Sequence, residues 1–307
     1  MSDLYYKGYW MVTNRCNLSC SYCVLENEPH QLKLELNINE KKEFISHLYK
    51  KLGFRRLTLS GGEVLIIGNN PPNGFIELLH HIRKFRSKDP SKNLEIELYT
   101  NGTYLNEKVI YEMQGVVDMI AITLDSIKNS FLIGIGRKYK GIDKYYEHII
   151  KVCGMLSKSN IKLKLHSVIG KKNYVSLPNE VAFIIDSIEN NGGIVSCWKF
   201  FQYMSYDVPK KDKMHSIPID LYKQFKKRVE RALEGREIHL HFKDNLEMNE
   251  SLFNILSYGN AQYMRKGDTW STSRRTKDLR LYNSMSELFA KHDIDEVLFK
   301  KFHEIQR

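Results

Sequence analysis

Short apolar runs alternate with amphipathic stretches along the first two thirds of this chain. In the stretches, apolar residues recur at helical spacing, as Phe44, Leu48 and Leu52 do, and the first helix is predicted to begin near Asn39, which can cap it. The runs are rich in β-branched and aromatic residues, which indicates strands. This alternation predicts βα units and a parallel sheet. The six predicted strands are residues 9–13, 56–60, 93–99, 116–124, 161–168 and 194–201.

Six such units predict an α/β fold, specifically a partial (β/α)6 TIM-type barrel formed by residues 1–205. From about residue 205 the pattern changes, and we expect residues 206–307 to form a C-terminal α/β cap that covers the active site. The cap is predicted to contain a charged linker at 210–213, a helix over 221–233, a strand at 238–242 and a closing helix at 288–302.

Composition limits the class of protein and its partners. The chain has 307 residues, 42% of them hydrophobic, and no apolar run approaches the ~20 residues that a membrane span requires. The first strand begins almost at the N-terminus, so we expect a soluble cytoplasmic protein without a membrane partner. The net charge of +11 favours anionic partners such as nucleic acid or phosphorylated metabolites, but charge alone does not choose among them.

Cys16, Cys20 and Cys23 form a C-x3-C-x2-C motif inside the predicted loop 14–24. Thiolates are the usual ligands of iron–sulfur clusters. Three of them can hold three irons of a [4Fe–4S] cluster and leave the fourth open to a small molecule, and this spacing is typical of enzymes that bind S-adenosylmethionine (SAM) there. A structural zinc site is less favoured, because it needs four converging ligands and only three cysteines cluster here. Disulfides fit poorly with an odd total of five cysteines.

Two further motifs follow predicted strands, at the end where chemistry gathers in barrels of this type. They are Gly61-Gly62-Glu63 and Thr100-Asn101-Gly102. Together with the cysteine motif they resemble the radical SAM superfamily. The resemblance implies that Gly61, Gly62 and Glu63 lie at the SAM amino group, Asn101 at its ribose, and Tyr22 at the cofactor. Because no Cys follows Cys197, we expect no auxiliary cluster.

Longer segments are similar to the viperin family within that superfamily. Residues 120–137 resemble the part of viperin in which the residues matching Ser126 and Arg137 hold the SAM carboxylate. Residues 164–169 are similar to its Lys-Ile-Asn-Ser-Val-Ile segment, and residues 197–202 to its Arg-Trp-Lys-Val-Phe-Gln segment. The resemblance implies that Val168 contacts the adenine of SAM and that a nucleoside triphosphate lies against Lys164, His166, Cys197 and Lys199.

Alternation places Lys164 and His166 on one face of their strand, but the pattern does not fix which face points inward. His166 stands where the family has Asn, and Cys197 where it has Arg. His166 is therefore also a catalytic candidate, as a replacement cation or a proton donor. A fainter similarity makes three residues candidate phosphate contacts, with a solvated basic loop as the alternative: Tyr258, Arg265 and Lys266.

The resemblance implies an enzyme that reductively cleaves SAM and uses the 5′-deoxyadenosyl radical on a nucleoside triphosphate. The product would be a 3′-deoxy-3′,4′-didehydro nucleotide, made by dehydration in antiviral defence, with flavodoxin or ferredoxin as electron donor. One alternative is a radical SAM enzyme that modifies a peptide or another phosphorylated metabolite. Another is a basic nucleic-acid-binding protein with a structural metal, although we expect no nucleic-acid partner.

Overall fold

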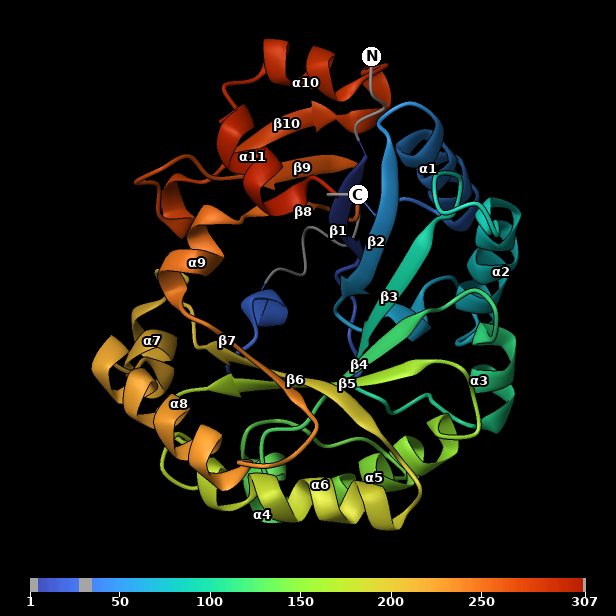
Figure 1. Cartoon of the computed structure of the whole chain (residues 1–307). Coiled ribbons are helices and arrows are strands. Elements are labelled where there is room, and N and C mark those ends of the chain that lie inside the picture. The colour runs from blue at the N-terminus through green and yellow to red at the C-terminus, as the bar shows by residue number, and fades with distance from the viewer. Residues whose placement is uncertain (1–4, 28–34, 306–307) are drawn as a thin grey trace.

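The computed structural model describes residues 5–27 and 35–305, and its strands form one curved sheet (Figure 1). The strand order is β10-β9-β8-β1-β2-β3-β4-β5-β6-β7. The strands from β8 to β7 in this order are parallel, whereas β9 and β10 are antiparallel to their neighbours. The strands are β1 (Tyr6–Thr13), β2 (Phe54–Gly61), β3 (Glu95–Thr100), β4 (Met119–Thr123), β5 (Lys162–Ile169), β6 (Val195–Gln202), β7 (His239–Lys243), β8 (Phe253–Ile255), β9 (Asn260–Tyr263) and β10 (Arg274–Asp278).

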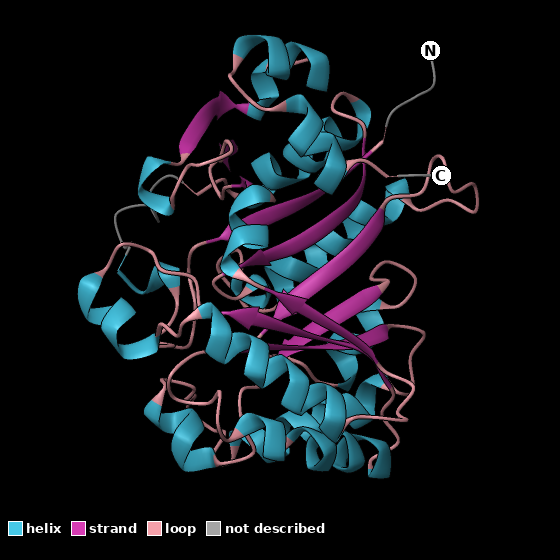
Figure 2. Cartoon of the chain, turned by 60° about the vertical axis from the view of Figure 1, so that its left-hand side comes forward, coloured by secondary structure: helices cyan, strands magenta, loops and turns pink. Residues whose placement is uncertain are grey.

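Helices cover the outer, convex side of the sheet, and the segment after β1 lies on its inner side (Figure 1). Figure 2 shows the strands in the middle of the molecule with helices around them. The helices are α1 (Ile38–Lys50), α2 (Asn73–Ile82), α3 (Glu107–Met113), α4 (Asn129–Gly134), α5 (Tyr145–Leu156), α6 (Val181–Asn190), α7 (Pro209–His215), α8 (Ile219–Ala232), α9 (Asn245–Glu250), α10 (Met285–Lys291) and α11 (Glu296–His303).

The predicted α/β class and parallel sheet are confirmed, and β1 to β7 coincide with the predicted strands to within a few residues. The barrel itself is not confirmed, because the sheet stays open, with β10 and β7 as its outer strands in the described ranges. Strands from residues 206–307 extend this sheet at both ends. The division of the chain at residue 205 stays a prediction.

Three local predictions are corrected by the structure. Helix α1 is capped by Asn37 and not by Asn39, because the Asn37 side chain accepts hydrogen bonds from the Asn39 and Glu40 amides at 3.0 and 3.1 Å. The predicted charged linker at 210–213 lies inside α7. The predicted closing helix is two helices, since Asp295 caps a separate α11 by accepting from the Leu298 amide at 2.9 Å.

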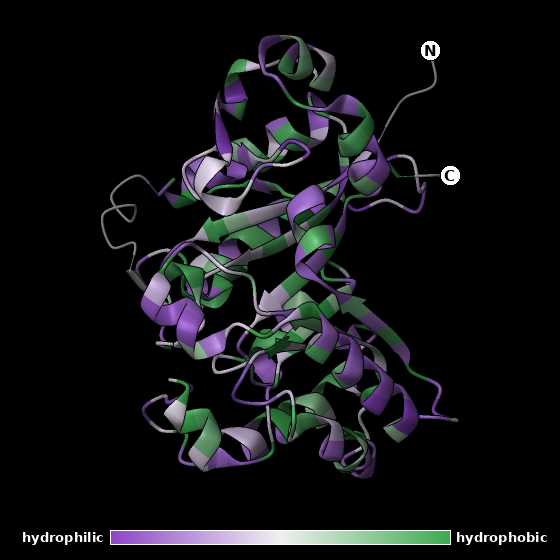
Figure 3. Cartoon of the chain, turned by 90° about the vertical axis from the view of Figure 1, so that its left-hand side faces the viewer, coloured by the Kyte–Doolittle hydropathy of each residue, from purple (hydrophilic) through white to green (hydrophobic). Residues whose placement is uncertain are grey.

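The apolar core fills the space between the sheet and the outer helices. Leu59, Leu98 and Ile122, on three neighbouring strands, are fully buried. In Figure 3 the helices carry hydrophobic and hydrophilic stretches in alternation, as expected when one face of each helix packs on the sheet. Among the described helices, none is both long and apolar enough to cross a membrane.

Replacing a central core side chain should destabilise the fold. We expect Leu98→Ala to lower the free energy of unfolding by about 2–5 kcal/mol, because the substitution leaves a cavity between β3 and the helices. The matched control is Ile194→Ala, whose side chain is 79% exposed, and we expect a change of about 0.5 kcal/mol or less. Urea unfolding curves measure both, and equal losses would contradict this assignment of the core.

Candidate active site

The cysteine motif lies in the loop after β1, and this loop is fastened to the end of β2. The amide of Gly62 donates to the Thr13 carbonyl oxygen, and the amide of Glu63 donates to that of Arg15, both at 2.8 Å. A Cβ on Gly62 would lie 2.0 Å from the Arg15 carbonyl oxygen. The glycines of the Gly-Gly-Glu motif are therefore required for close backbone approach at the start of the loop.

A second attachment holds the middle of the loop. The amides of Ser19 and Ser21 donate to the carbonyl oxygens of Gly136 and Ile135 at 3.2 and 2.9 Å. Gly136 has a φ of +89°, and a Cβ there would lie 1.9 Å from the Ser19 carbonyl oxygen. The segment that contains Arg137 is thus in backbone contact with the cysteine loop.

The surroundings of the sulfur atoms fit thiolate ligands. The Leu18 amide donates to Sγ of Cys16, and the Leu25 amide donates to Sγ of Cys23, both at 3.4 Å. Burial raises the pKa of the Cys20 thiol, and the Arg137 guanidinium opposes this by stabilising the thiolate. Among the described residues, no group of His, Cys, Asp or Glu converges on a single metal ion. A cluster needs no such convergence, since each thiolate binds a different iron.

Asn101, predicted at the SAM ribose, lies beside the cysteine loop. Its Nδ2 donates to Oδ1 of Asn17 at 2.9 Å and lies 3.9 Å from Sγ of Cys16. Its Oδ1 accepts from the amide and hydroxyl of Thr103. Asn101 is therefore held rigidly at the edge of the predicted cluster site.

Glu63, predicted at the SAM amino group, is fully buried. Its carboxylate accepts from the Leu65 amide at 3.1 Å, the Thr100 hydroxyl at 2.8 Å and the Asn101 amide at 2.7 Å. Burial raises the pKa of Glu63 to about 6, and these hydrogen bonds oppose the shift. In this structure Glu63 ties the end of β2 to the end of β3, and its contact with SAM stays a prediction.

Asp125 connects three of the predicted cofactor residues, although the sequence analysis assigned it no role. One carboxylate oxygen accepts from the Tyr22 hydroxyl at 2.7 Å and from Nε of Arg137 at 2.9 Å. The other accepts from the Val168 amide at 2.9 Å. Arg137 also donates to the hydroxyls of Tyr22 and Tyr145. The available signal was the position of Asp125 at the end of a predicted strand, directly before Ser126.

Tyr22 and Val168 line a small cavity together, with Asp125 at its wall. The cavity therefore brings together Tyr22, which was predicted at the cofactor, and Val168, which was predicted at the adenine of SAM. Ser126 is engaged elsewhere, because its hydroxyl donates to the Glu180 carboxylate at 2.8 Å. The two residues predicted at the SAM carboxylate therefore contact two different carboxylates of the protein: Ser126 contacts Glu180, and Arg137 contacts Asp125.

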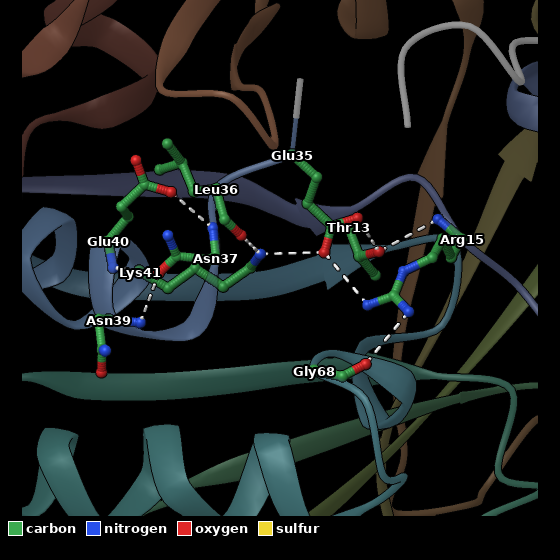
Figure 4. A network of polar contacts seen from close by, with 9 residues as sticks. All are labelled: Thr13, Arg15, Glu35, Leu36, Asn37, Asn39, Glu40, Lys41 and Gly68. Carbon is green, nitrogen blue, oxygen red and sulfur yellow. Dashed lines mark hydrogen bonds and ion pairs between the residues drawn. The ribbon is translucent and has the colours of Figure 1, made fainter. Parts of the chain in front are cut away.

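A polar network closes the base of the cysteine loop (Figure 4). The Thr13 hydroxyl donates to Glu35 at 2.7 Å, and the buried ammonium of Lys41 donates to the same carboxylate at 3.0 Å. Arg15 adds an ion pair to Glu35 and a hydrogen bond to the Gly68 carbonyl oxygen at 3.2 Å. No sequence motif marked Glu35 or Lys41, and the contacts of Glu35 with Thr13 and Arg15 span about 20 residues of sequence.

The lysines predicted at the phosphates lie on the inner face of the sheet. In the parallel register Lys164 lies beside Cys197, and His166 beside Lys199. Phe200, on the opposite face of β6, packs on α8. Alternation therefore directs Lys164 and Lys199 away from the helices, to the side where the cysteine loop lies (Figure 1).

A row of rings crosses this inner face. The ring centroids are 5.7 Å apart for Tyr9 and Tyr99, 4.4 Å for Tyr99 and His166, and 5.1 Å for His166 and Phe201. Burial raises the pKa of Tyr9 to about 12, and Cys23 contributes to this rise because it is close by. The row thus connects the cysteine loop to the predicted phosphate residues.

The charged groups on this face are unevenly paired. Lys164 donates to Glu97 at 2.7 Å. Burial lowers the pKa of Lys199 to about 7, and its lysine neighbours add to this effect. Burial and the nearby Lys164 and Lys199 hold the pKa of His166 well below its usual value, so its ring is neutral. In the described part of the chain its Nε2 has no hydrogen-bond partner.

The remaining substrate candidates are distributed over β6 and the segments that follow β8 and β9. Cys197 is a half-buried free thiol, and burial raises its pKa. Tyr258 follows β8, whereas Arg265 and Lys266 follow β9. Arg265 forms an ion pair with Asp293, and Lys266 is exposed. Their contact with phosphate stays a prediction.

The close approach at Gly136 can be tested against a second glycine. Gly136 and Gly141 have nearly equal φ angles, +89° and +87°, but a Cβ on Gly141 meets nothing within 4 Å. We expect Gly141→Ala to cost about 1–2 kcal/mol of unfolding free energy, from backbone strain alone. Gly136→Ala should lower the free energy of unfolding by more than this, because the added Cβ forces the cysteine loop to move. The displaced loop should also bind less iron per chain after anaerobic reconstitution. Equal iron contents in the two variants would contradict this.

Comparison with known proteins agrees with this geometry. Residues 10–181, more than half of the chain, match the family model described as the Radical SAM superfamily. An S-adenosylmethionine-dependent nucleotide dehydratase of a Thermoplasmatales archaeon is 24% identical over 53% of this chain and 52% of its own. A GTP 3′,8-cyclase of Rhizobium etli is 26% identical over 56% of this chain and 46% of its own. The chain thus spans about half the length of the curated relatives it matches.

Among solved structures, native anSMEcpe with bound AdoMet and the Kp18Cys peptide has the same fold. It aligns with a TM-score of 0.64 at 16% identity, over 96% of this chain and 82% of that chain. The chain therefore belongs to the radical SAM superfamily, and the cofactors predicted from its sequence, a [4Fe–4S] cluster and SAM, are those of the family.

Proposed function

We propose that this enzyme acts on a nucleoside triphosphate and that it is a viperin-like nucleotide dehydratase. The observation that carries the proposal is the position of Lys164 and Lys199, which are diagonal neighbours on β5 and β6 and share the inner face of the sheet. A buried ammonium is costly unless an anion accompanies it. The nucleotide dehydratase and the GTP cyclase among the relatives support a nucleotide substrate.

The residues of this chain would divide the work as follows. Lys164 and Lys199 bind phosphate oxygens, and the row of rings from Tyr9 to Phe201 excludes water from the sugar. When bound, the cluster and SAM supply the radical that removes a hydrogen atom from the substrate. Neutral His166 is a member of this row and lies beside Lys199, where its Nε2, which has no hydrogen-bond partner among the described residues, can bind a ribose hydroxyl.

SAM would be held by the residues that surround the cysteine loop. We propose that Glu63 and Asn101 bind its amino group and ribose, and that Tyr22 and Val168 enclose its adenine. The guanidinium of Arg137 has N–H groups left after its bonds to Asp125, Tyr22 and Tyr145, and these would reach the SAM carboxylate. An electron donor such as flavodoxin or ferredoxin would reduce the cluster.

The substrate proposal is tested by anaerobic reconstitution with a panel of nucleoside triphosphates. We expect one of them to stimulate 5′-deoxyadenosine formation and to yield a product lighter by one water, measured by mass spectrometry. Lys199→Met should raise the KM for that nucleotide about tenfold, as expected for a lost charged contact. The control Lys227→Met, on the exposed side of α8, should change nothing. If 5′-deoxyadenosine forms equally fast with and without every nucleotide, the substrate proposal is wrong.

Substrate affinity should also depend on pH through Lys199. Because its pKa is about 7, the Lys199 side chain carries a positive charge below pH 7 and loses this charge as the pH rises above 7. We therefore expect the KM to increase from about pH 6 to about pH 8.5. In Lys199→Met this increase in KM should be absent, and only the pH dependence that comes from titration of the nucleotide itself should remain. If the KM–pH profile of Lys199→Met equals that of the unchanged protein, the assignment of the pH dependence to Lys199 is wrong. The charged or titratable groups that face Lys199 are Lys164, Glu97, His166, Cys197, His241, Lys243 and Glu247.

A further inference from the structure

Strand β7 places another lysine on the same inner face. Phe242 stacks on Phe200 at 5.1 Å on the helix side of the sheet. Alternation therefore turns His241 and Lys243 inward. In the register of β6 and β7, His241 lies beside Lys199, and Lys243 lies two residues further along.

Lys164, Lys199 and Lys243 consequently form a diagonal row across β5, β6 and β7. Each step moves one strand sideways and two residues along the chain direction. With strands ~4.8 Å apart and a rise of ~3.3 Å per residue, successive Cα atoms lie roughly 8 Å apart. The Cα atoms at the two ends of the row thus lie roughly 16 Å apart, a span that suits a chain of phosphates better than a single phosphate group.

Among the described residues the far end of the row has no ion pair, and Glu247 acts on Lys199 and Lys243 only from a longer distance. Lys164 pairs with Glu97 at 2.7 Å, but no carboxylate of the described residues lies within 4.0 Å of the ammonium of Lys199 or Lys243. Lys243 donates to the neutral Ser251 hydroxyl at 2.6 Å. Burial lowers the pKa of Lys243, and Lys243 is the charge that most lowers the pKa of Lys199. Two ammonium groups therefore repel each other in a partly buried place, which an anion would relieve.

We propose that Lys243 is a specificity-determining residue that binds the distal phosphates, so that the site selects substrates with a chain of two or more phosphates over a monophosphate. The inference rests on the proposed function, because it takes Lys164 and Lys199 as phosphate ligands. It adds a cation from β7, which lies outside the segments that resemble viperin. Within those segments, one cation is absent because Cys197 stands at the position of the family's Arg.

The test measures binding of inorganic phosphate, pyrophosphate and tripolyphosphate to the reconstituted holoenzyme by anaerobic calorimetry, with the cluster absorbance followed throughout. We expect affinity to rise with the number of phosphates. Lys243→Met should weaken tripolyphosphate binding about tenfold and leave phosphate binding unchanged, because only the longer anion reaches β7. Lys243→Arg should retain the preference, since the charge remains.

The control variant is Ser251→Ala, which removes the hydrogen-bond partner of Lys243 and keeps its charge. If Lys243 only joins β7 to the segment before β8, Ser251→Ala will reproduce the loss, and the inference is overturned. Equal weakening of all three anions by Lys243→Met overturns it as well. The binding of inorganic anions does not depend on turnover, so this test is independent of the proposed dehydratase activity. That activity is contradicted by a different result, namely that no nucleotide stimulates 5′-deoxyadenosine formation.

Discussion

The backbone contact between the cysteine loop and the end of β2 is the constraint on which the site depends. Gly62 and Glu63 donate to the carbonyl oxygens of Thr13 and Arg15, and only glycine leaves room for this approach at Gly62. Because the attachment uses main-chain atoms, it fixes where the loop starts without consuming side chains. The second attachment, at Gly136 just after α4, then sets the position of Cys20.

Around this loop, buried carboxylates organise the side chains. Glu63 joins β2 to β3, while Asp125 joins β4 to the loop and to β5. Each carboxylate has at least three donors, and removing one partner of such a group costs more than the bond contributes. The residues predicted to hold SAM are therefore already oriented in the protein by partners of its own, so binding would require little reorganisation.

The sequence predicted the parts of the site that depend on local pattern. Strand ends could be located because apolar runs stop at Gly61 and Thr100, and parallel strands bring such ends together. The inward direction of Lys164 could not be deduced, since both faces of β5 alternate in a similar way. Asp125, Lys41 and Lys243 carry no motif, and Asp125 accepts from Tyr22, which lies 103 residues away in the sequence. Residues 210–213 were misassigned because a short charged helix has almost no apolar stripe.

The diagonal lysine row has a consequence for the protein without its substrate. Repulsion between partly buried ammonium groups subtracts from the folding free energy, whereas an anion that binds only the folded chain adds to it by mass action. If the row binds the proposed substrate, folding and substrate supply are thermodynamically linked. The chain would unfold, and be degraded, more readily in a cell depleted of polyphosphate-bearing metabolites, so its abundance would follow the metabolite that it consumes.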